Sequence, residues 1–276
     1  MSNFWGEKFS VLTYVDLLGK NTLDFFRQLC RTFIFFYLSI RLTLSLRWHA
    51  LKTILHVTIS QIYFTGVLAL PLMTFIALAV GSIVVMQSNA QLSVLGSQEM
   101  MGNILVVTIV RELGPLLTAL IVIARSGTAV ASELGNMQVN REIEGLRVMG
   151  IEPLSYVVFP RIVGGIVGLL CLAFYFNSIA LLGGFFVAST VSELTFSFYL
   201  EVISHAMNTH DFSLNIFKNI VGGIIIFSIA CEEGFKVKNG PHEVPIATTK
   251  SVVSAIVTIM AFNLGLTAMI FAKDLL

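Results

Sequence analysis

Two charged residues interrupt an apolar stretch of the chain, in the segment VRELGPLL at positions 110–117. Arg111 and Glu112 lie between the runs NILVVTI and TALIVIA, and Gly114-Pro115 follows them. A charge in the middle of a membrane costs several kcal/mol, so such residues usually face a partner or a water-filled cavity. Neighbours in a helix point about 100° apart. We therefore expect at least one of the two to reach a cavity or another helix, and a structural ion pair that locks two helices is the alternative.

Lys218 raises the same question in a later apolar run. It lies about two turns inside that run, close enough to an end for its side chain to snorkel to the interface. The alternative is that Lys218 and Arg111 together hold the anionic head group of a lipid. The Gly114-Pro115 pair frees backbone groups, and it predicts a kink where a neighbouring helix or cavity water takes up a carbonyl.

The elements that must position these residues are membrane-spanning helices. Of the 276 residues, 56% are hydrophobic and only 12% are charged, whereas soluble proteins are about a quarter charged. The mean hydropathy is +0.86. Because a span needs about 20 apolar residues, the sequence predicts an all-α integral membrane protein with five spans, at residues 62–86, 100–124, 162–187, 212–231 and 251–272.

The basic residues predict the orientation of these spans. Seven precede the first span, four lie between the second and third, Arg125 among them, and three lie between the fourth and fifth, which sums to 14 of the 17. Cytoplasmic loops carry the excess of Lys and Arg. We therefore expect a cytoplasmic N-terminus and a periplasmic C-terminus.

The first 52 residues differ in character from residues 53–276, which form the five-span domain. Asp24, Arg27 and Arg31 recur at helical spacing, and phenylalanines cover much of the remaining circumference. This pattern is typical of an amphipathic helix that lies in the membrane interface. The sequence thus predicts an N-terminal interfacial helix before the spans.

The connection between the second and third spans contains the segment NREIEGLRVMGIEPL. Ile143, Leu146 and Met149 recur at i, i+3 and i+6, and Gly150 and Pro153 end the pattern. This spacing predicts a short amphipathic cytoplasmic helix at about residues 140–150. It is either a solvated loop helix or a docking helix for a cytoplasmic partner.

Several other functions are excluded by what the sequence lacks. A net charge of +1 without a basic run argues against a nucleic acid partner. The segment Gly19-Lys20-Asn21-Thr22 lacks the earlier glycine and the Ser or Thr of a phosphate-binding loop. The three cysteines and five histidines show no metal-ligand spacing. We expect no catalytic residue, metal or bound cofactor in this chain.

The sequence resembles the MlaE family of ABC-transporter permeases, the membrane subunits of bacterial MCE-type lipid transport systems. The resemblance rests on the segment from Val110 to Arg161, which contains Arg-Glu-Leu-Gly-Pro, Ala-Arg-Ser-Gly, Glu-Leu-Gly and Met-Gly-Ile-Glu-Pro-Leu. It extends from about residue 62 to the end of the chain. The N-terminal 50 residues and the outer loop QSNAQLSVLGSQEMMG depart from the family.

The resemblance implies a transporter subunit of the bacterial inner membrane that helps to maintain outer membrane lipid asymmetry. Its partners would be a second copy of itself, a cytoplasmic ATPase dimer that uses the ATP, a periplasmic MCE-domain ring and, in some systems, a small cytoplasmic accessory protein. Phospholipid would occupy a cavity between the two permeases. The residues implied in lipid binding are Arg111, Glu112, Lys218, Val84, Leu92 and Leu95. Those implied in coupling to the ATPase are Arg141, Glu142, Glu144, Leu146, Arg147 and Met149.

Two other functions compete with this interpretation. An ion- or proton-coupled channel or secondary transporter would use Arg111, Glu112 and Lys218 to carry ions, although the chain lacks the internal repeat that such transporters usually show. A membrane scaffold without transport would have no use for the charges within its spans.

Overall fold

The computed structural model describes residues 27, 30–43, 48–95, 99–191, 195–238 and 240–274. These residues form helices and turns, and they contain no strand. Residues 30–43 are helical. The elements that follow are α2 Trp48–Thr65, η1 Val67–Ala69, α3 Leu70–Leu95, α4 Glu99–Leu105, η2 Val106–Leu113, α5 Gly114–Val122, η3 Ile123–Gly127, α6 Thr128–Val139, α7 Glu142–Val148, η4 Leu154–Val158, α8 Phe159–Val191, α9 Phe196–Ala206, α10 Thr209–Phe235 and α11 Glu243–Asp274.

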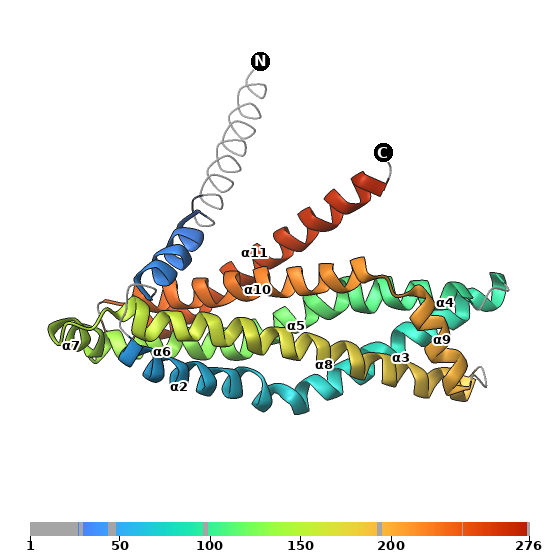
Figure 1. The fold of residues 1–276 in the computed structure, drawn as a ribbon, viewed down its shortest axis with the longest axis horizontal. Coiled ribbons are helices and arrows are strands. Elements are labelled where there is room, and N and C mark those ends of the chain that lie inside the picture. The colour runs from blue at the N-terminus through green and yellow to red at the C-terminus, as the bar shows by residue number, and fades with distance from the viewer. Residues whose placement is uncertain are drawn as a thin grey trace, which may run out of the picture.

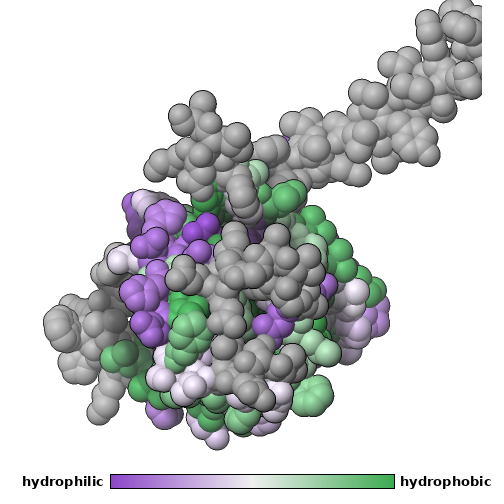
Figure 2. Space-filling model, turned by 90° about the vertical axis from the view of Figure 1, so that its right-hand side faces the viewer, coloured by the Kyte–Doolittle hydropathy of each residue, from purple (hydrophilic) through white to green (hydrophobic). Residues whose placement is uncertain are grey.

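The long helices lie side by side along one axis and form an elongated bundle (Figure 1). Helix α7 lies at one end of the bundle, and α4 and α9 lie at the other. We call these the α7 end and the α9 end. Helix α11 diverges from α10 toward the C-terminus. Figure 2 looks onto the α9 end, where hydrophilic residues gather on one side of the end face and hydrophobic residues lie beside them.

Five of the described segments are long and apolar enough to cross a membrane, which confirms the five predicted spans. They are Ile54–Asn89, Met101–Val139, Leu154–Thr190, Thr209–Phe235 and Glu243–Ile270. All five are longer than predicted at one or both ends, because charged residues near a span's end do not stop the helix. The second span, for example, continues through Arg125 to Val139. The prediction that Arg125 lies in the connecting loop is therefore wrong.

The first span is broken where the sequence predicted its start. Helix α2 ends at Thr65, a short 3-10 turn follows Gly66, and α3 begins at Leu70 with Pro71 in its first turn. Proline fits the first turn of a helix, where its missing N–H has no intrahelical acceptor. The boundary predicted between residues 52 and 53 falls inside α2.

Helix α8 lies at the centre of the fold and packs against α2, α3, α5 and α10. Gly81 of α3 faces the backbone of Ala180 so closely that a Cβ atom at Gly81 would overlap it. Small residues allow helix backbones to approach in a membrane, where lipid offers no hydrophobic drive for association. The core between these helices includes the fully buried side chains of Met73, Phe176 and Phe227.

The predicted interfacial helix falls only partly within the described residues. Within residues 30–43, Thr32, Ser39 and Thr43 are buried, and Phe35 and Phe36 pack against the core. The Ser39 hydroxyl donates to the Leu154 carbonyl at 3.2 Å. The predicted positions Asp24, Phe25, Phe26 and Leu29 lie outside the described residues.

Candidate functional site

A stripe of polar residues runs along one face of α10. Asp211, Asn215, Lys218 and Asn219 follow one another at i, i+4, i+7 and i+8, which places them on one helical face. None of the four is more than 3% exposed. The stripe packs against η2, the segment that contains Arg111 and Glu112. Sequence reasoning identified only Lys218, although the spacing of all four was present in the sequence.

Arg111 pairs with Asp211 and not with its neighbour Glu112. The Nε of Arg111 donates to Oδ1 of Asp211 at 2.9 Å, and Nη2 donates to the same oxygen. The other carboxylate oxygen accepts the Asn208 N–H at 3.2 Å and completes a capping box at the start of α10. One carboxylate therefore caps a helix and neutralises a cation from another span.

Lys218 pairs with Glu112 and is held deep inside the bundle. Its Nζ donates to Oε1 of Glu112 at 3.0 Å and to the Arg111 carbonyl at 2.9 Å. The Thr267 hydroxyl of α11 donates to the Glu112 carboxylate at 3.1 Å. The Lys218 side chain is 1% exposed, so of the two alternatives that the sequence left open, snorkelling to the interface does not hold. The Glu112 carboxylate and the Arg111 carbonyl accept from the ammonium inside the bundle, so Lys218 does not need to reach the membrane interface.

Pro115 explains why the backbone near Arg111 accepts these side-chain donors. Proline has no N–H, so it cannot donate to the carbonyl four residues earlier, as in an α-helix, or to the carbonyl five residues earlier, as in a π-helix. These are the carbonyls of Arg111 and Val110, and they accept from Lys218 at 2.9 Å and from Asn215 at 2.6 Å. The helix takes π-helical geometry here, since the Gly114 N–H reaches the Ile109 carbonyl five residues back. Such π segments are frequent at functional sites.

Arg111, Glu112, Asp211, Lys218 and Thr267 form what we call the interspan cluster. It joins the second, fourth and fifth spans, and its two cations balance its two carboxylates. The side chains of Asp211 and Lys218 are closed to solvent, whereas 23% of Arg111 and 34% of Glu112 remain exposed. Arg111 and Glu112 are therefore the two charged groups of the cluster that a ligand can reach.

The other residues predicted to bind lipid are less well defined. Val84 of α3 is half-buried and packs against the apolar core. The side chains of Leu92 and Leu95 lie outside the described residues. Their contact with lipid stays a prediction.

The helix predicted between the second and third spans is α7, at the end of the bundle. Ile143 is buried and Leu146 packs against the core, while Glu142, Glu144 and Arg147 are exposed. Met149, which was expected on the same apolar face, is 67% exposed because the helix ends at Val148. Val148 and Met149 thus form an exposed apolar tip.

The entry into α7 is conformationally unusual. Arg141 has a φ of 58°, the left-handed region that side chains other than glycine rarely adopt. This single residue turns the chain from α6 into α7, and the Asn140 amide donates to the Glu142 carboxylate at 3.2 Å just after it. The predicted coupling residues Arg141, Glu142, Glu144, Leu146, Arg147 and Met149 therefore lie together on one projecting turn and short helix.

A second charged group lies at the α7 end and was missed by sequence reasoning. Lys236 Nζ lies 2.8 Å from Glu232 and 2.5 Å from Glu233, and Lys250 Nζ lies 3.4 Å from Glu233. We call these four residues the α7-end cluster. Burial lowers the pKa of Lys236, but hydrogen bonds to Glu232 and Glu233 outweigh it and the pKa is raised. Nearby, Arg161 pairs with Glu133 at 2.7 Å.

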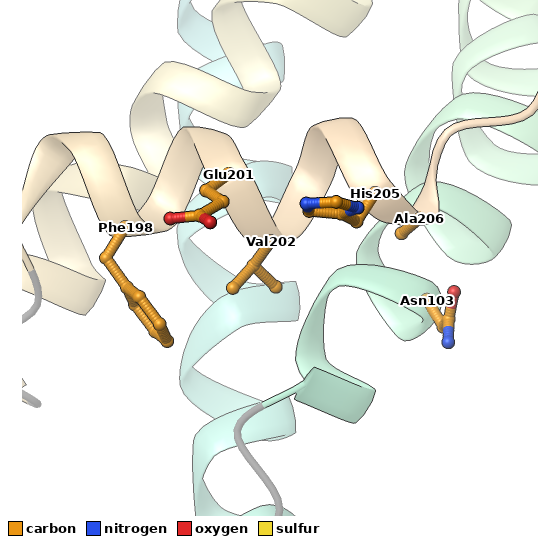
Figure 3. Close-up of a pocket in the computed structure, with 6 residues that line it drawn as sticks. All are labelled: Asn103, Phe198, Glu201, Val202, His205 and Ala206. Carbon is orange, nitrogen blue, oxygen red and sulfur yellow. The ribbon is translucent and has the colours of Figure 1, made fainter.

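A hollow of about 420 Å³ opens at the α9 end, between α4 and α9 (Figure 3). Glu201 and His205 lie one turn apart on α9, and Asn103 of α4 lines the same hollow. Among the described residues no group of three or more His, Cys, Asp or Glu side chains could hold a metal ion. Polar and apolar side chains thus line the hollow together, and the described part of the chain offers no metal-ligand set there.

Comparison with known proteins identifies the family of the chain. The sequence profile described as Permease MlaE matches residues 58–269, which include all five residues of the cluster. The chain belongs to the MlaE permease family. It is thus an integral, multi-pass membrane protein of the ABC permease type, a subunit type that is not itself catalytic.

Relatives in other organisms match the chain over most of its length. A protein of Rickettsia felis described as a probable ABC transporter permease protein is 26% identical over 95% of this chain and 99% of its own length. The intermembrane phospholipid transport system permease protein MlaE of Haemophilus influenzae is 24% identical over 95% of this chain and 98% of its own. The chloroplastic protein TRIGALACTOSYLDIACYLGLYCEROL 1 of Arabidopsis thaliana is 28% identical over 78% of this chain.

Proposed function

We propose that this chain is the permease subunit of an ABC transporter that moves phospholipids between the inner and outer membranes of a bacterium. The observation that carries the proposal is the interspan cluster, which joins three spans of an MlaE-family chain and leaves Arg111 and Glu112 partly exposed. The Haemophilus influenzae relative, a permease of an intermembrane phospholipid transport system, supports the same substrate class. Two copies of the chain would enclose the lipid cavity, and a separate ATPase would supply the energy.

The orientation follows from the basic residues, and it assigns the α7 end to the cytoplasm. Arg141, Arg147, Lys236, Lys238 and Lys250 lie at this end or in its loops, and the positive-inside rule favours the cytoplasm for them. The ATPase dimer would dock on α7, where Val148 and Met149 expose apolar surface. The α9 end would then face the periplasm and an MCE-domain ring, and an accessory protein would bind on the cytoplasmic side.

The geometry of the cluster suggests how a lipid head group is held without being trapped. A phosphodiester accepts charge-assisted hydrogen bonds from a guanidinium, and Arg111 offers its exposed N–H groups while Asp211 fixes its position. Because the cluster is charge-balanced, a phosphate gains little long-range attraction and binds through direct contact alone. Glu112 orients Lys218 and does not attract phosphate.

A lipid crosslinking experiment tests this proposal. A photoreactive amino acid at Leu266, which adjoins Thr267 and leaves the hydroxyl bonded to Glu112 in place, should crosslink phospholipid in cells grown with ³²P-phosphate. The matched control is Val253 on the same helix, which is 56% exposed and close to the α7 end, and the label is expressed relative to it. Excess label at Leu266 that disappears in an Arg111→Gln background is expected. Equal label at both positions, unchanged by Arg111→Gln, would leave the cluster as a purely structural lock.

A second experiment tests the coupling role of α7. Reversing the exposed Arg147 to Glu should weaken copurification of the ATPase without preventing membrane insertion. Lys238→Glu is the control, since Lys238 is an exposed cation in the other loop at the same end. An ATPase that copurifies equally with both variants would contradict docking on α7.

A reporter fusion tests the orientation. A reporter that is active only in the cytoplasm, fused after Leu276, should be silent. An active reporter would place the α7 end on the opposite side of the membrane.

A further inference from the structure

Arg125 is the cation of the Ala-Arg-Ser-Gly segment and lies within the second span, in the π-helical segment η3. Its Nη1 donates to the Phe64 carbonyl at 2.8 Å, and its guanidinium carbon lies 5.1 Å from the centre of the Phe64 ring. Phe64 belongs to the last turn of α2, just before the break in the first span. A helix end leaves its carbonyls without donors, so Arg125 satisfies one of them.

The depth of Arg125 follows from its neighbours. Phe64 lies ten residues inside the first span from Ile54, which is about 15 Å at the helical rise. A Cβ atom at Gly127 would lie 3.6 Å from Ile226, which is nine residues from the end of α10. Arg125 therefore lies well inside the bundle, between the interspan cluster and the α7 end.

The charge of Arg125 distinguishes it from the other basic residues in or beside the spans. Arg111, Lys218, Arg161, Lys236 and Lys250 each face a carboxylate within 3.4 Å. Among the residues that the structure describes, no carboxylate lies within ion-pair distance of Arg125. Its two partners are a carbonyl and an aromatic ring, which stabilise a cation only in part. A guanidinium has five N–H donors, and Phe64 accepts from one nitrogen.

The surface around Arg125 is apolar and open. Arg125 itself is half-buried, and Tyr63, Val67 and Leu68 beside the break are 57%, 47% and 47% exposed. A cation without a counter-charge at the edge of an exposed apolar surface matches the chemistry of an amphiphile with an anionic head. An ionisable residue within a span is otherwise expected to have a charged partner.

We infer that Arg125 and the exposed surface around the end of α2 form a binding site for the phosphate of a phospholipid in the leaflet at the α7 end. The phosphodiester would accept hydrogen bonds from the guanidinium N–H groups that Phe64 leaves free, and the acyl chains would lie along Val67 and Leu68. The inference rests on the proposed function, because it gives the transported class of lipid a second position on the same chain.

The test places a photoreactive amino acid at Leu68 in cells grown with ³²P-phosphate. Phe75, which is 75% exposed on the same span, carries the same group as a control for bulk lipid, and the label at Leu68 is divided by the label at Phe75. Arg125→Gln should reduce this ratio about tenfold, the effect of losing a hydrogen bond to a charged group. Arg125→Lys keeps the cation and should retain most of the label.

Three outcomes would overturn the inference. The first is an unchanged ratio in Arg125→Gln. The second is an equal loss in the Lys and Gln variants at normal protein levels, which would show that the bond to Phe64 matters and the charge does not. The third is a crosslink to protein in place of lipid, which would assign the missing anion to a second chain.

Crosslinking at Leu266 in the same strains separates this inference from the proposed function. Lipid label above the control at Leu266, without Arg125-dependent label at Leu68, would contradict only the second site. Arg125-dependent label at Leu68, without excess label at Leu266, would confirm this site and contradict the lipid cavity at the interspan cluster.

Discussion

The interspan cluster and the α7-end cluster contain the same kinds of residue but are built differently. In the interspan cluster the paired residues are 100 and 106 positions apart, and the most deeply buried member is the cation Lys218. In the α7-end cluster the carboxylates of Glu232 and Glu233 are buried, Lys236 is a neighbour one turn away, and the cations are 38% and 63% exposed.

The difference shows which cluster suits a ligand. The α7-end cluster presents lysine ammonium groups to water, so its carboxylates are neutralised locally and the cluster holds the ends of α10 and α11 together. The interspan cluster closes Asp211 and Lys218 and leaves Arg111 and Glu112 accessible within the spans, where a polar surface has no structural need. Buried anchors with reachable partners are typical of a preorganised site.

The largest effect is expected from Asp211→Asn. Asparagine keeps an oxygen for the capping box but leaves the Arg111 cation unpaired, and breaking a buried pair in this way costs about 3 kcal/mol. The measurement is the thermal exposure of buried Cys231 to a thiol-reactive dye, in a background with Cys30 and Cys171 changed to Ser. The double variant Asp211→Asn with Arg111→Gln should recover part of the loss. If Asp211→Asn unfolds at the same temperature as the parent protein, the ion pair between Arg111 and Asp211 does not stabilise the fold.

A smaller loss is expected from Lys218→Met. Methionine fills a similar volume, but Glu112 and the Arg111 carbonyl lose their donor. Because Glu112 is one-third exposed and keeps Thr267, water offsets part of the loss, and we expect about 2 kcal/mol. The same thermal assay measures it. Lys218→Arg retains the charge and serves as the control; a snorkelling lysine would instead make both variants neutral.

Lys236→Met should cost less, about 1 kcal/mol, because an exposed partner is screened by solvent. Lys238→Met, at an exposed position in the same loop, is the matched control. The folded pKa of Lys236 is raised above 10.5, so its contribution is fully present below pH 10.5 and is lost as the pH rises through the folded pKa. The difference in unfolding temperature between the parent protein and the variant should thus be constant at neutral pH and shrink above pH 10.5. If the difference in unfolding temperature instead grows above pH 10.5, the Lys236 ammonium does not stabilise the fold through Glu232 and Glu233.

The smallest effect is expected from Thr267→Val, about 0.5 kcal/mol, since one neutral hydrogen bond to a partly exposed carboxylate is lost. Its value is diagnostic, because the hydroxyl links α11 to the cluster. Lipid crosslinking from Leu266 should fall while the unfolding temperature barely changes, and Thr249→Val near the other end of α11 should leave the crosslink unaffected. A large loss of stability in Thr267→Val would show instead that the Thr267 hydroxyl holds α11 against the rest of the bundle.

Much of the fold could be predicted from the sequence. A bilayer accepts only long apolar segments with satisfied backbones, so five apolar runs predict five helical spans. The predicted helix at about residues 140–150 corresponds to α7 at Glu142–Val148, since its periodicity and the Gly150 after it are local signals. Arg111, Glu112 and Lys218 were identified as site candidates for the same reason, because a charge within an apolar run is visible in the sequence and is costly in a membrane unless it has a partner or meets water.

The partners of those charges were decided by the tertiary structure alone. Arg111 meets Asp211, and Glu112 meets Lys218, because α10 packs against η2. Helix α8 packs close beside them, since at Gly114 a Cβ atom would overlap Asn177 of α8. Sequence spacing fixes which residues share a helical face, but it carries no information on which face of another helix lies opposite. The geometry of the break at Thr65 and the Arg125 contact with Phe64 depend likewise on packing between segments 61 residues apart. The sequence therefore determined where charge lies in the membrane, and the packing of the helices determined which charges remain open to a ligand.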